Sequence, residues 1–162
     1  MKASWWLPDL AATEALGRAL ARTCPWGAEA LMLHLSGDLG AGKTTLAAAA
    51  IQSLGIKEAV RSPSYSLIEI YQGDDWQAVH VDLYRLQAAE ELEQLGLRDF
   101  FVARTLFLVE WPQRAFGALP APDLHIRLEV VPQRQAHLQA GSPLGERWLA
   151  ATQSMLATEV GS

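Results

Sequence analysis

Eight residues early in the chain have the composition of a phosphate-binding loop. Residues 37–44 are Gly-Asp-Leu-Gly-Ala-Gly-Lys-Thr and fit the pattern G-x-x-x-x-G-K-[ST]. Glycines permit backbone shapes in which successive N–H groups converge on phosphate oxygens at the positive end of the following helix. The pattern therefore predicts an ATP site in which Lys43 reaches the β- and γ-phosphates and the hydroxyl of Thr44 binds Mg²⁺.

The loop residues that we expect to contact the nucleotide are Asp38, Leu39, Gly40, Ala41, Gly42, Lys43, Thr44 and Thr45. Lys43 is also expected to act in catalysis. Thr45 has two interpretations, because it could touch the α-phosphate or only occupy the first turn of the helix. The whole segment has a structural alternative, a glycine-rich turn between strand and helix with a surface lysine. The apolar run before it and the alanine run after it favour the nucleotide site.

Two carboxylates end apolar runs and could manage the metal ion and the attacking water. Residues 106–109 form a continuous apolar run that ends at Glu110, and the alternating run 79–81 ends at Asp82. A P-loop ATPase needs an acidic residue at the tip of a neighbouring core strand. We expect Glu110 to be a metal ligand and a catalytic residue, and Asp82 to be catalytic. The alternative for each is a carboxylate that caps backbone groups at a strand end.

A serine-rich segment between the loop helix and the next strands could act as a switch. Residues 62–65 are Ser-Pro-Ser-Tyr, and Ser64 is predicted to present its hydroxyl to the γ-phosphate or the metal. An ordinary turn started by Ser-Pro is the alternative. Trp111 is expected to lie against the nucleotide, although a buried aromatic would also explain it. His80 is interpreted as a packed or hydrogen-bonded histidine rather than a base.

Composition indicates a globular protein in a reducing compartment. The chain has 162 residues, of which half are hydrophobic, and a net charge of -5. Its single cysteine, Cys24, cannot form an internal disulfide. No apolar run approaches membrane-spanning length, so we expect a cytoplasmic protein without membrane contact. The negative charge argues against direct binding of nucleic acid, although Arg127, Arg134 and His137 could form a local phosphate patch instead of a solvated strand face.

The hydrophobic pattern predicts an α/β fold and one P-loop ATPase domain over residues 1–162. We expect a P-loop NTPase-like three-layer sandwich, with a mostly parallel central sheet, an antiparallel hairpin insertion and antiparallel late strands. The predicted helices cover residues 9–23, 45–54, 88–94 and 146–156, with Asp9 or Thr13 as the first cap. The predicted strands cover residues 31–36, 66–71, 77–83, 105–109, 124–131 and 135–140.

Four separated segments together resemble one family. They are Gly-Asp-Leu-Gly-Ala-Gly-Lys-Thr-Thr-Leu at 37–46, Ser-Pro-Ser-Tyr-Ser-Leu at 62–67, His-Val-Asp-Leu-Tyr-Arg-Leu at 80–86 and Val-Glu-Trp-Pro at 109–112. In this order they are similar to the TsaE (YjeE) family, the bacterial ATPase of threonylcarbamoyladenosine tRNA modification. The combination is far more specific than the phosphate loop alone.

This resemblance implies a role beside the TsaD and TsaB proteins, which install the threonylcarbamoyl group on the adenosine after the anticodon. Transfer RNA would then be met only indirectly, through that complex. The resemblance also implies nucleotide and Mg²⁺ binding by Lys43 and Thr44, a metal role for Glu110, and a catalytic or metal-supporting role for Asp82. The family's usual Ser-Pro-Thr-Phe differs here, because Ser64 keeps only the hydroxyl and Tyr65 adds one without an assigned role.

A phosphate loop also occurs in other functional classes, among them a nucleotide-gated binding module whose own hydrolysis is too slow to matter alone. A regulatory GTPase would recognise guanine through Asn-Lys-x-Asp, and the sequence contains no asparagine. A P-loop small-molecule kinase is the stronger alternative, since it shares the loop and an acidic strand end. It would need a second pocket and a lid arginine, for which Arg85, Arg98 and Arg114 are candidates. We expect ATP hydrolysis to be slow without partners.

Overall fold

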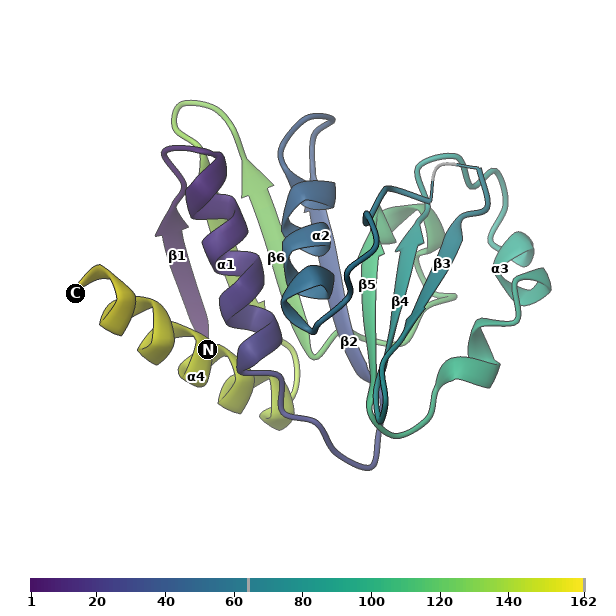
Figure 1. Cartoon of the computed structure of the whole chain (residues 1–162). Coiled ribbons are helices and arrows are strands. Elements are labelled where there is room, and N and C mark those ends of the chain that lie inside the picture. The colour runs from purple at the N-terminus through teal and green to yellow at the C-terminus, as the bar shows by residue number, and fades with distance from the viewer. Residues whose placement is uncertain (64, 162) are drawn as a thin grey trace.

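A computed structural model describes residues 1–63 and 65–161 of the chain, and its centre is a seven-stranded sheet in the order β1-β7-β6-β2-β5-β4-β3 (Figure 1). The strands are β1 (Lys2–Trp6), β2 (Leu31–Gly37), β3 (Ile68–Gln72), β4 (Gln77–Asp82), β5 (Thr105–Glu110), β6 (Leu124–Glu129) and β7 (Gln135–Ala140). The helices are α1 (Leu10–Arg22), α2 (Lys43–Ser53), α3 (Glu90–Gln94) and α4 (Pro143–Val160), with short 3-10 helices η1 (Leu97–Phe100) and η2 (Pro112–Ala115).

The four central strands are parallel, and this arrangement brings the predicted site residues together. β2 pairs with β5 and β6, and β5 pairs with β4, all in parallel register. β3 forms an antiparallel hairpin with β4 at one edge, and β7 runs antiparallel to both β6 and β1. These pairings confirm the predicted α/β fold. Asp82 aligns with Glu110, which aligns with Leu35, so three strands end at one edge of the sheet.

The long helices cover one face of the sheet. In Figure 1, α1 and α2 stand side by side against the sheet, and α4 runs across the side near β1. The core beneath them includes Leu16, Leu20, Leu46 and Trp148, all of them buried. The Trp148 indole donates a hydrogen bond to the Leu20 carbonyl at 2.9 Å, so its one polar group is satisfied inside the core.

A glycine lets α1 approach α2 closely. A Cβ added to Gly17 would lie 2.5 Å from the Leu46 carbonyl oxygen. Gly17→Ala should therefore lower the free energy of unfolding by about 1–3 kcal/mol, because overpacking outweighs the better helix propensity of alanine. Urea denaturation measures this change. Gly27→Ala is the matched control, because its added Cβ would meet nothing closer than 3.9 Å. Equal stability of the two variants would contradict the close-contact explanation.

The opposite face of the sheet is covered only in part. Buried residues Val79, Val81, Phe107 and Val109 pack there beneath α3, η1 and η2. This outer layer is thin compared with the three long helices on the other face. The half formed by β6, β7 and β1 carries polar residues instead. Arg127 and His137 there both contact Glu129, whereas Arg134 lies in the turn between β6 and β7, so binding of phosphate by these three residues stays untested.

Two histidines lie where the covered and open halves of this face meet. His34 and His125 are paired across β2 and β6, with ring centroids 6.4 Å apart. Burial, followed by the proximity of His125, lowers the pKa of His34 from 6.5 to about 4. The pKa of His125 is lowered too, first by burial and then by Arg127.

The shifted pKa of His34 predicts a pH-dependent stability. Above the unfolded pKa of 6.5 both states are neutral at this residue, while between 6.5 and about 4 only the unfolded chain takes up the proton. The protein should therefore become less stable as the pH is lowered below 6.5. Protonation of His34 in the unfolded chain should by itself lower the free energy of unfolding by about 2 kcal/mol between pH 7.5 and pH 5. Urea denaturation at both pH values measures this effect. From pH 7.5 to pH 5, the free energy of unfolding of His34→Leu should decrease by about 2 kcal/mol less than that of the parent protein. An equal loss in both proteins would contradict the prediction.

One strand is absent from the sequence prediction. β1 is a short edge strand with alternating exposed residues, among them Lys2, Ser4 and Trp6, and it pairs only with β7. Its stability depends on a partner at the other end of the chain, which no local pattern reveals. No helix among the described residues is long and apolar enough to cross a membrane.

Several predicted boundaries shift for local reasons. α2 begins at Lys43 rather than residue 45, because Gly42 with φ 109° closes the loop earlier. Asp9, and not Thr13, caps α1 by accepting a hydrogen bond from Ala12 N at 2.8 Å. β3 begins at Ile68 rather than residue 66, because Leu67 is left-handed with φ 62°.

The late elements shift as well. β6 ends at Glu129 rather than residue 131, shortly before Pro132, which has no N–H for a ladder. α4 begins at Pro143 rather than residue 146, because the Ser142 hydroxyl accepts from Gly145 N at 2.9 Å and caps it. α4 also continues to Val160 rather than residue 156, and α3 begins at Glu90 rather than residue 88. The remaining ends agree within one residue, which is the precision of such boundaries.

Candidate active site

The phosphate-binding loop connects β2 to α2, as predicted, and its glycines adopt conformations that other residues disfavour. Gly37, Gly40 and Gly42 have φ values of 142°, 78° and 109°. A Cβ at Gly37 would also lie 2.5 Å from the Leu128 carbonyl oxygen of β6. The loop is therefore shaped by glycine at both ends, and α2 follows it directly with its N-terminal N–H groups facing the loop.

Lys43 lies on the inner side of this loop. The residue is only 5% exposed. Its ammonium donates hydrogen bonds to the carbonyls of Gly37 at 2.6 Å and Asp38 at 2.8 Å. The ammonium also lies 4.3 Å from the centre of the Trp111 ring. Burial lowers the pKa of Lys43, and the nearby Glu110, Asp82 and Asp38 carboxylates oppose that shift. Burial thus has the larger effect on this cation, and the three carboxylates offset it only in part.

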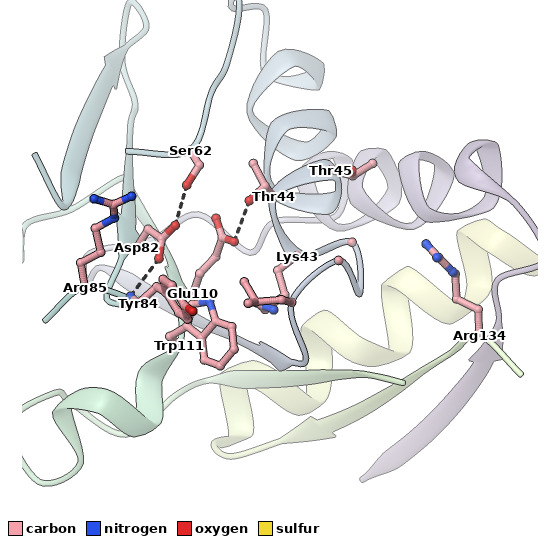
Figure 2. A pocket seen from close by; sticks show the side chains of 13 residues that line it. Lys43, Thr44, Thr45, Ser62, Asp82, Tyr84, Arg85, Glu110, Trp111 and Arg134 are labelled. Carbon is pink, nitrogen blue, oxygen red and sulfur yellow. Dashed lines mark hydrogen bonds between the residues drawn. The ribbon is translucent and has the colours of Figure 1, made fainter. Parts of the chain in front are cut away.

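Thr44 and Glu110 are in direct contact. The Thr44 hydroxyl donates to Glu110 Oε1 at 2.8 Å, from the first turn of α2 to the tip of β5 (Figure 2). The other carboxylate oxygen, Oε2, lies 2.6 Å from His80 Nε2. Glu110 is only 2% exposed, so its carboxylate is held inside the protein beside the loop. The predicted histidine is therefore a packed and hydrogen-bonded residue.

Asp82 links the adjacent strand to the predicted switch segment. Its Oδ2 accepts a hydrogen bond from the Ser62 hydroxyl at 2.5 Å, and its Oδ1 accepts from Tyr84 N at 3.0 Å. Its backbone N–H donates to the Leu67 carbonyl at 2.9 Å. Residues on both sides of position 64 are therefore tied to Asp82. Ser64 itself lies outside the described residues, so its predicted contact stays a prediction.

These groups line one pocket of about 370 Å³ at the edge of the sheet where the parallel strands end. Figure 2 shows Thr44, Glu110, Asp82 and Ser62 gathered on one side, with Arg134 across the phosphate loop from them. The lining residues are Leu39, Gly40, Gly42, Lys43, Thr44, Thr45, Ser62, Asp82, Tyr84, Arg85, Glu110, Trp111 and Arg134. The structure thus brings together all the predicted catalytic residues.

Two predicted contacts lie outside the pocket lining. Ala41 is fully buried in the core, and Asp38 borders a neighbouring hollow that also includes Trp111. Both belong to the loop, so only their backbone atoms are suited to a phosphate. Thr45 lines the pocket and also lies in the first turn of α2, so its contact with the α-phosphate stays a prediction.

Ser62, Tyr84 and Arg134 are not among the residues predicted for the nucleotide site, although Ser62 belongs to the predicted switch segment and Arg134 to a possible patch for nucleic-acid phosphate. Ser62 and Tyr84 lie inside the segments 62–67 and 80–86, and both contact Asp82. Arg134 comes from the β6 to β7 turn, and no local pattern places that turn beside the phosphate loop. Of the candidate lid arginines, only Arg85 lines the pocket.

The donor set of this pocket suits magnesium only together with a nucleotide. Among residues 1–63 and 65–161, no group of three or more His, Cys, Asp or Glu residues could hold a metal ion by itself. The Thr44 hydroxyl and the Glu110 carboxylate supply two hard oxygen donors in contact with each other. Mg²⁺ retains waters and takes oxygens from substrate phosphates, so two protein donors are consistent with a nucleotide-bound ion.

Comparison with known proteins assigns the chain to a family. Residues 7–137 match the family described as "Threonylcarbamoyl adenosine biosynthesis protein TsaE". The chain belongs to the TsaE family. This membership confirms the predicted family and assigns the chain to tRNA threonylcarbamoyladenosine biosynthesis.

Individual TsaE proteins and one solved structure agree with this assignment. The protein of that name from Haemophilus influenzae is 40% identical over 124 residues, which are 76% of this chain and 78% of the relative. The Streptomyces coelicolor TsaE is 36% identical over 149 residues, which are 88% and 97% of the two chains. The crystal structure of Bacillus subtilis YdiB has a TM-score of 0.77 and 25% identity, with 96% of each chain covered.

Proposed function

We propose that this chain is the ATPase of threonylcarbamoyladenosine modification, and that it binds and hydrolyses Mg-ATP in the pocket beside the phosphate loop. The observation that carries the proposal is the hydrogen bond between Thr44 and Glu110 in the pocket beside the phosphate loop. Lys43 lines the same pocket and is hydrogen-bonded to the loop. A metal-binding hydroxyl, an acidic strand tip and a buried cation are the parts that phosphate transfer to water requires. Residues 1–162 would form one P-loop ATPase domain.

In this proposal each group has a separate task. The backbone N–H groups of residues 38–45 and the Lys43 ammonium bind the phosphates, while Thr44 and Glu110 would hold Mg²⁺. The bound ion would offset the charge of the phosphates during transfer. Asp82 would orient the attacking water or a metal-bound water from the next strand. Leu39 and Arg134 would contact the outer end of the nucleotide, and Trp111 would lie beside its phosphates.

The switch role of residues 62–67 follows from their attachment to Asp82. If ATP rearranges Asp82, the Ser62 and Leu67 hydrogen bonds transmit that change to the segment. The segment exposes Tyr65, which is 89% accessible and lies 4.9 Å from the Arg85 guanidinium. We propose that ATP shapes this segment for contact with TsaD and TsaB, and that hydrolysis releases them. Transfer RNA would be met through that complex.

Reconstituted threonylcarbamoyl transfer tests this function. With TsaD, TsaB, tRNA and the threonylcarbamoyl donor present, repeated turnover should require both this protein and ATP. Asp82→Ala should lower the yield of modified tRNA at least tenfold while keeping the protein folded. Normal modification without the protein would refute the proposal. Transfer of the γ-phosphate to a small molecule without partners would support the kinase alternative instead.

A further inference from the structure

The ring of His80 is enclosed in the protein, and one of its nitrogens contacts Glu110. His80 is 0% exposed, and its Nε2 lies 2.6 Å from Glu110 Oε2. Its other ring nitrogen, Nδ1, is buried without a hydrogen-bond partner among the described residues. An unpartnered buried nitrogen is destabilising, and a leucine or phenylalanine in this place would avoid it. The contact with Glu110 therefore offers a reason for a histidine at this buried position.

We propose that His80 is a positioning residue, which fixes the Glu110 side chain by donating from Nε2 to Oε2. A carboxylate oxygen can only accept, so Nε2 carries the hydrogen. With Oε2 held on one side, Oε1 faces the Thr44 hydroxyl, at 2.8 Å. The role of this orientation in metal binding rests on the proposed function, whereas the hydrogen bond itself does not.

The strand register explains why residue 80 can reach residue 110. β4 and β5 are parallel, with His80 opposite Leu108 and Asp82 opposite Glu110. Because side chains alternate along a strand, His80 and Asp82 project from the same face as Glu110. That face is the one covered by α2, which carries Thr44. His80 thus contacts the Glu110 carboxylate at Oε2, whereas Thr44 contacts it at Oε1.

A flexible side chain gains most from such a contact. Glutamate has three rotatable side-chain bonds, so without a partner at Oε2 its carboxylate can turn away from Thr44. Residues that hydrogen-bond a metal-ligating carboxylate orient it, and their loss typically weakens metal affinity or activity 10–100-fold. His80 would serve this purpose for the pair formed by Thr44 and Glu110.

Three substitutions separate this role from simple filling of space. His80→Gln can place an amide N–H near the Nε2 position, His80→Asn is too short to do so, and His80→Phe fills the volume without a donor. The readouts are the Mg²⁺ concentration for half-maximal ATP hydrolysis and the nucleotide affinity in EDTA. For His80→Asn and His80→Phe, the Mg²⁺ requirement should rise about tenfold or more, while His80→Gln should stay within about threefold of the parent. Nucleotide affinity in EDTA should not change.

A second measurement tests the hydrogen bond in the absence of metal and nucleotide. It does not depend on whether a His80 variant folds. Long-range ¹H–¹⁵N spectra of the ¹⁵N-histidine-labelled protein should show a protonated His80 Nε2, whose chemical shift changes in Glu110→Gln. The corresponding His34 signals should not change. An unprotonated Nε2 would overturn the proposal, as would His80→Gln being as impaired as His80→Asn, or folded His80→Asn and His80→Phe with the parent's Mg²⁺ requirement. If the parent showed no Mg²⁺-dependent hydrolysis, the proposed function and the metal role would fail, and the spectra would still decide the hydrogen bond.

Discussion

Lys43→Ala should reduce ATP binding and hydrolysis by about 100-fold or more. The ammonium is buried against the carbonyls of Gly37 and Asp38, and among the described residues no other lysine lines the pocket. Its removal deletes the positive charge that would meet the β- and γ-phosphates. Titration with a fluorescent ATP analogue and an assay of phosphate release measure the two losses.

The exposed Lys57 supplies the matched control for this substitution. It follows α2 and does not line the pocket, so Lys57→Ala should keep the nucleotide affinity and the hydrolysis rate of the parent. Circular dichroism and urea denaturation would establish that both variants are folded. Full hydrolysis by a folded Lys43→Ala protein would show that the phosphate loop is not the reaction site.

Glu110→Gln should lower the rate of hydrolysis by about 100-fold while nucleotide affinity in EDTA remains close to that of the parent. Glutamine has nearly the same shape and can still accept from Thr44, but it lacks the negative charge that would hold a divalent cation. The substitution therefore keeps the volume of a residue that is 2% exposed, and it removes the charge together with the acceptor that faces His80. Phosphate release measured over a range of Mg²⁺ concentrations should show both a lower rate and a higher Mg²⁺ requirement.

A glutamate far from the pocket controls for the loss of one negative charge. Glu146 lies on the surface of α4, where its carboxylate is 3.5 Å from the N-terminal amine. Glu146→Gln should hydrolyse ATP at the parental rate. If Glu110→Gln kept both the rate and the Mg²⁺ requirement of the parent, Glu110 would have no metal role.

Short-range patterns were sufficient to predict most of the candidate site. The glycine spacing at residues 37–44 indicates the phosphate loop because each glycine adopts a positive φ, which other residues disfavour. Asp82 and Glu110 could be nominated because both end apolar strands, and parallel strands end at a common edge. Their alignment in the sheet confirms that they meet.

Features that depend on distant pairing were beyond local patterns. β1 forms a strand by pairing with β7, which lies at the other end of the chain. Arg134 reaches the pocket because the turn between β6 and β7 lies near the phosphate loop. The contact between Ser62 and Asp82 spans the hairpin that separates them in sequence. The lowered pKa of His34 depends on its pairing with β6, which places His125 next to it.

Phosphate release from ATP by the purified protein, with TsaD and TsaB present, is the most direct test of the proposed ATPase role. We expect Mg²⁺-dependent release that increases when both partners are added and disappears with Lys43→Ala. The absence of Mg²⁺-dependent phosphate release, even with both partners at saturating concentrations, would contradict that role.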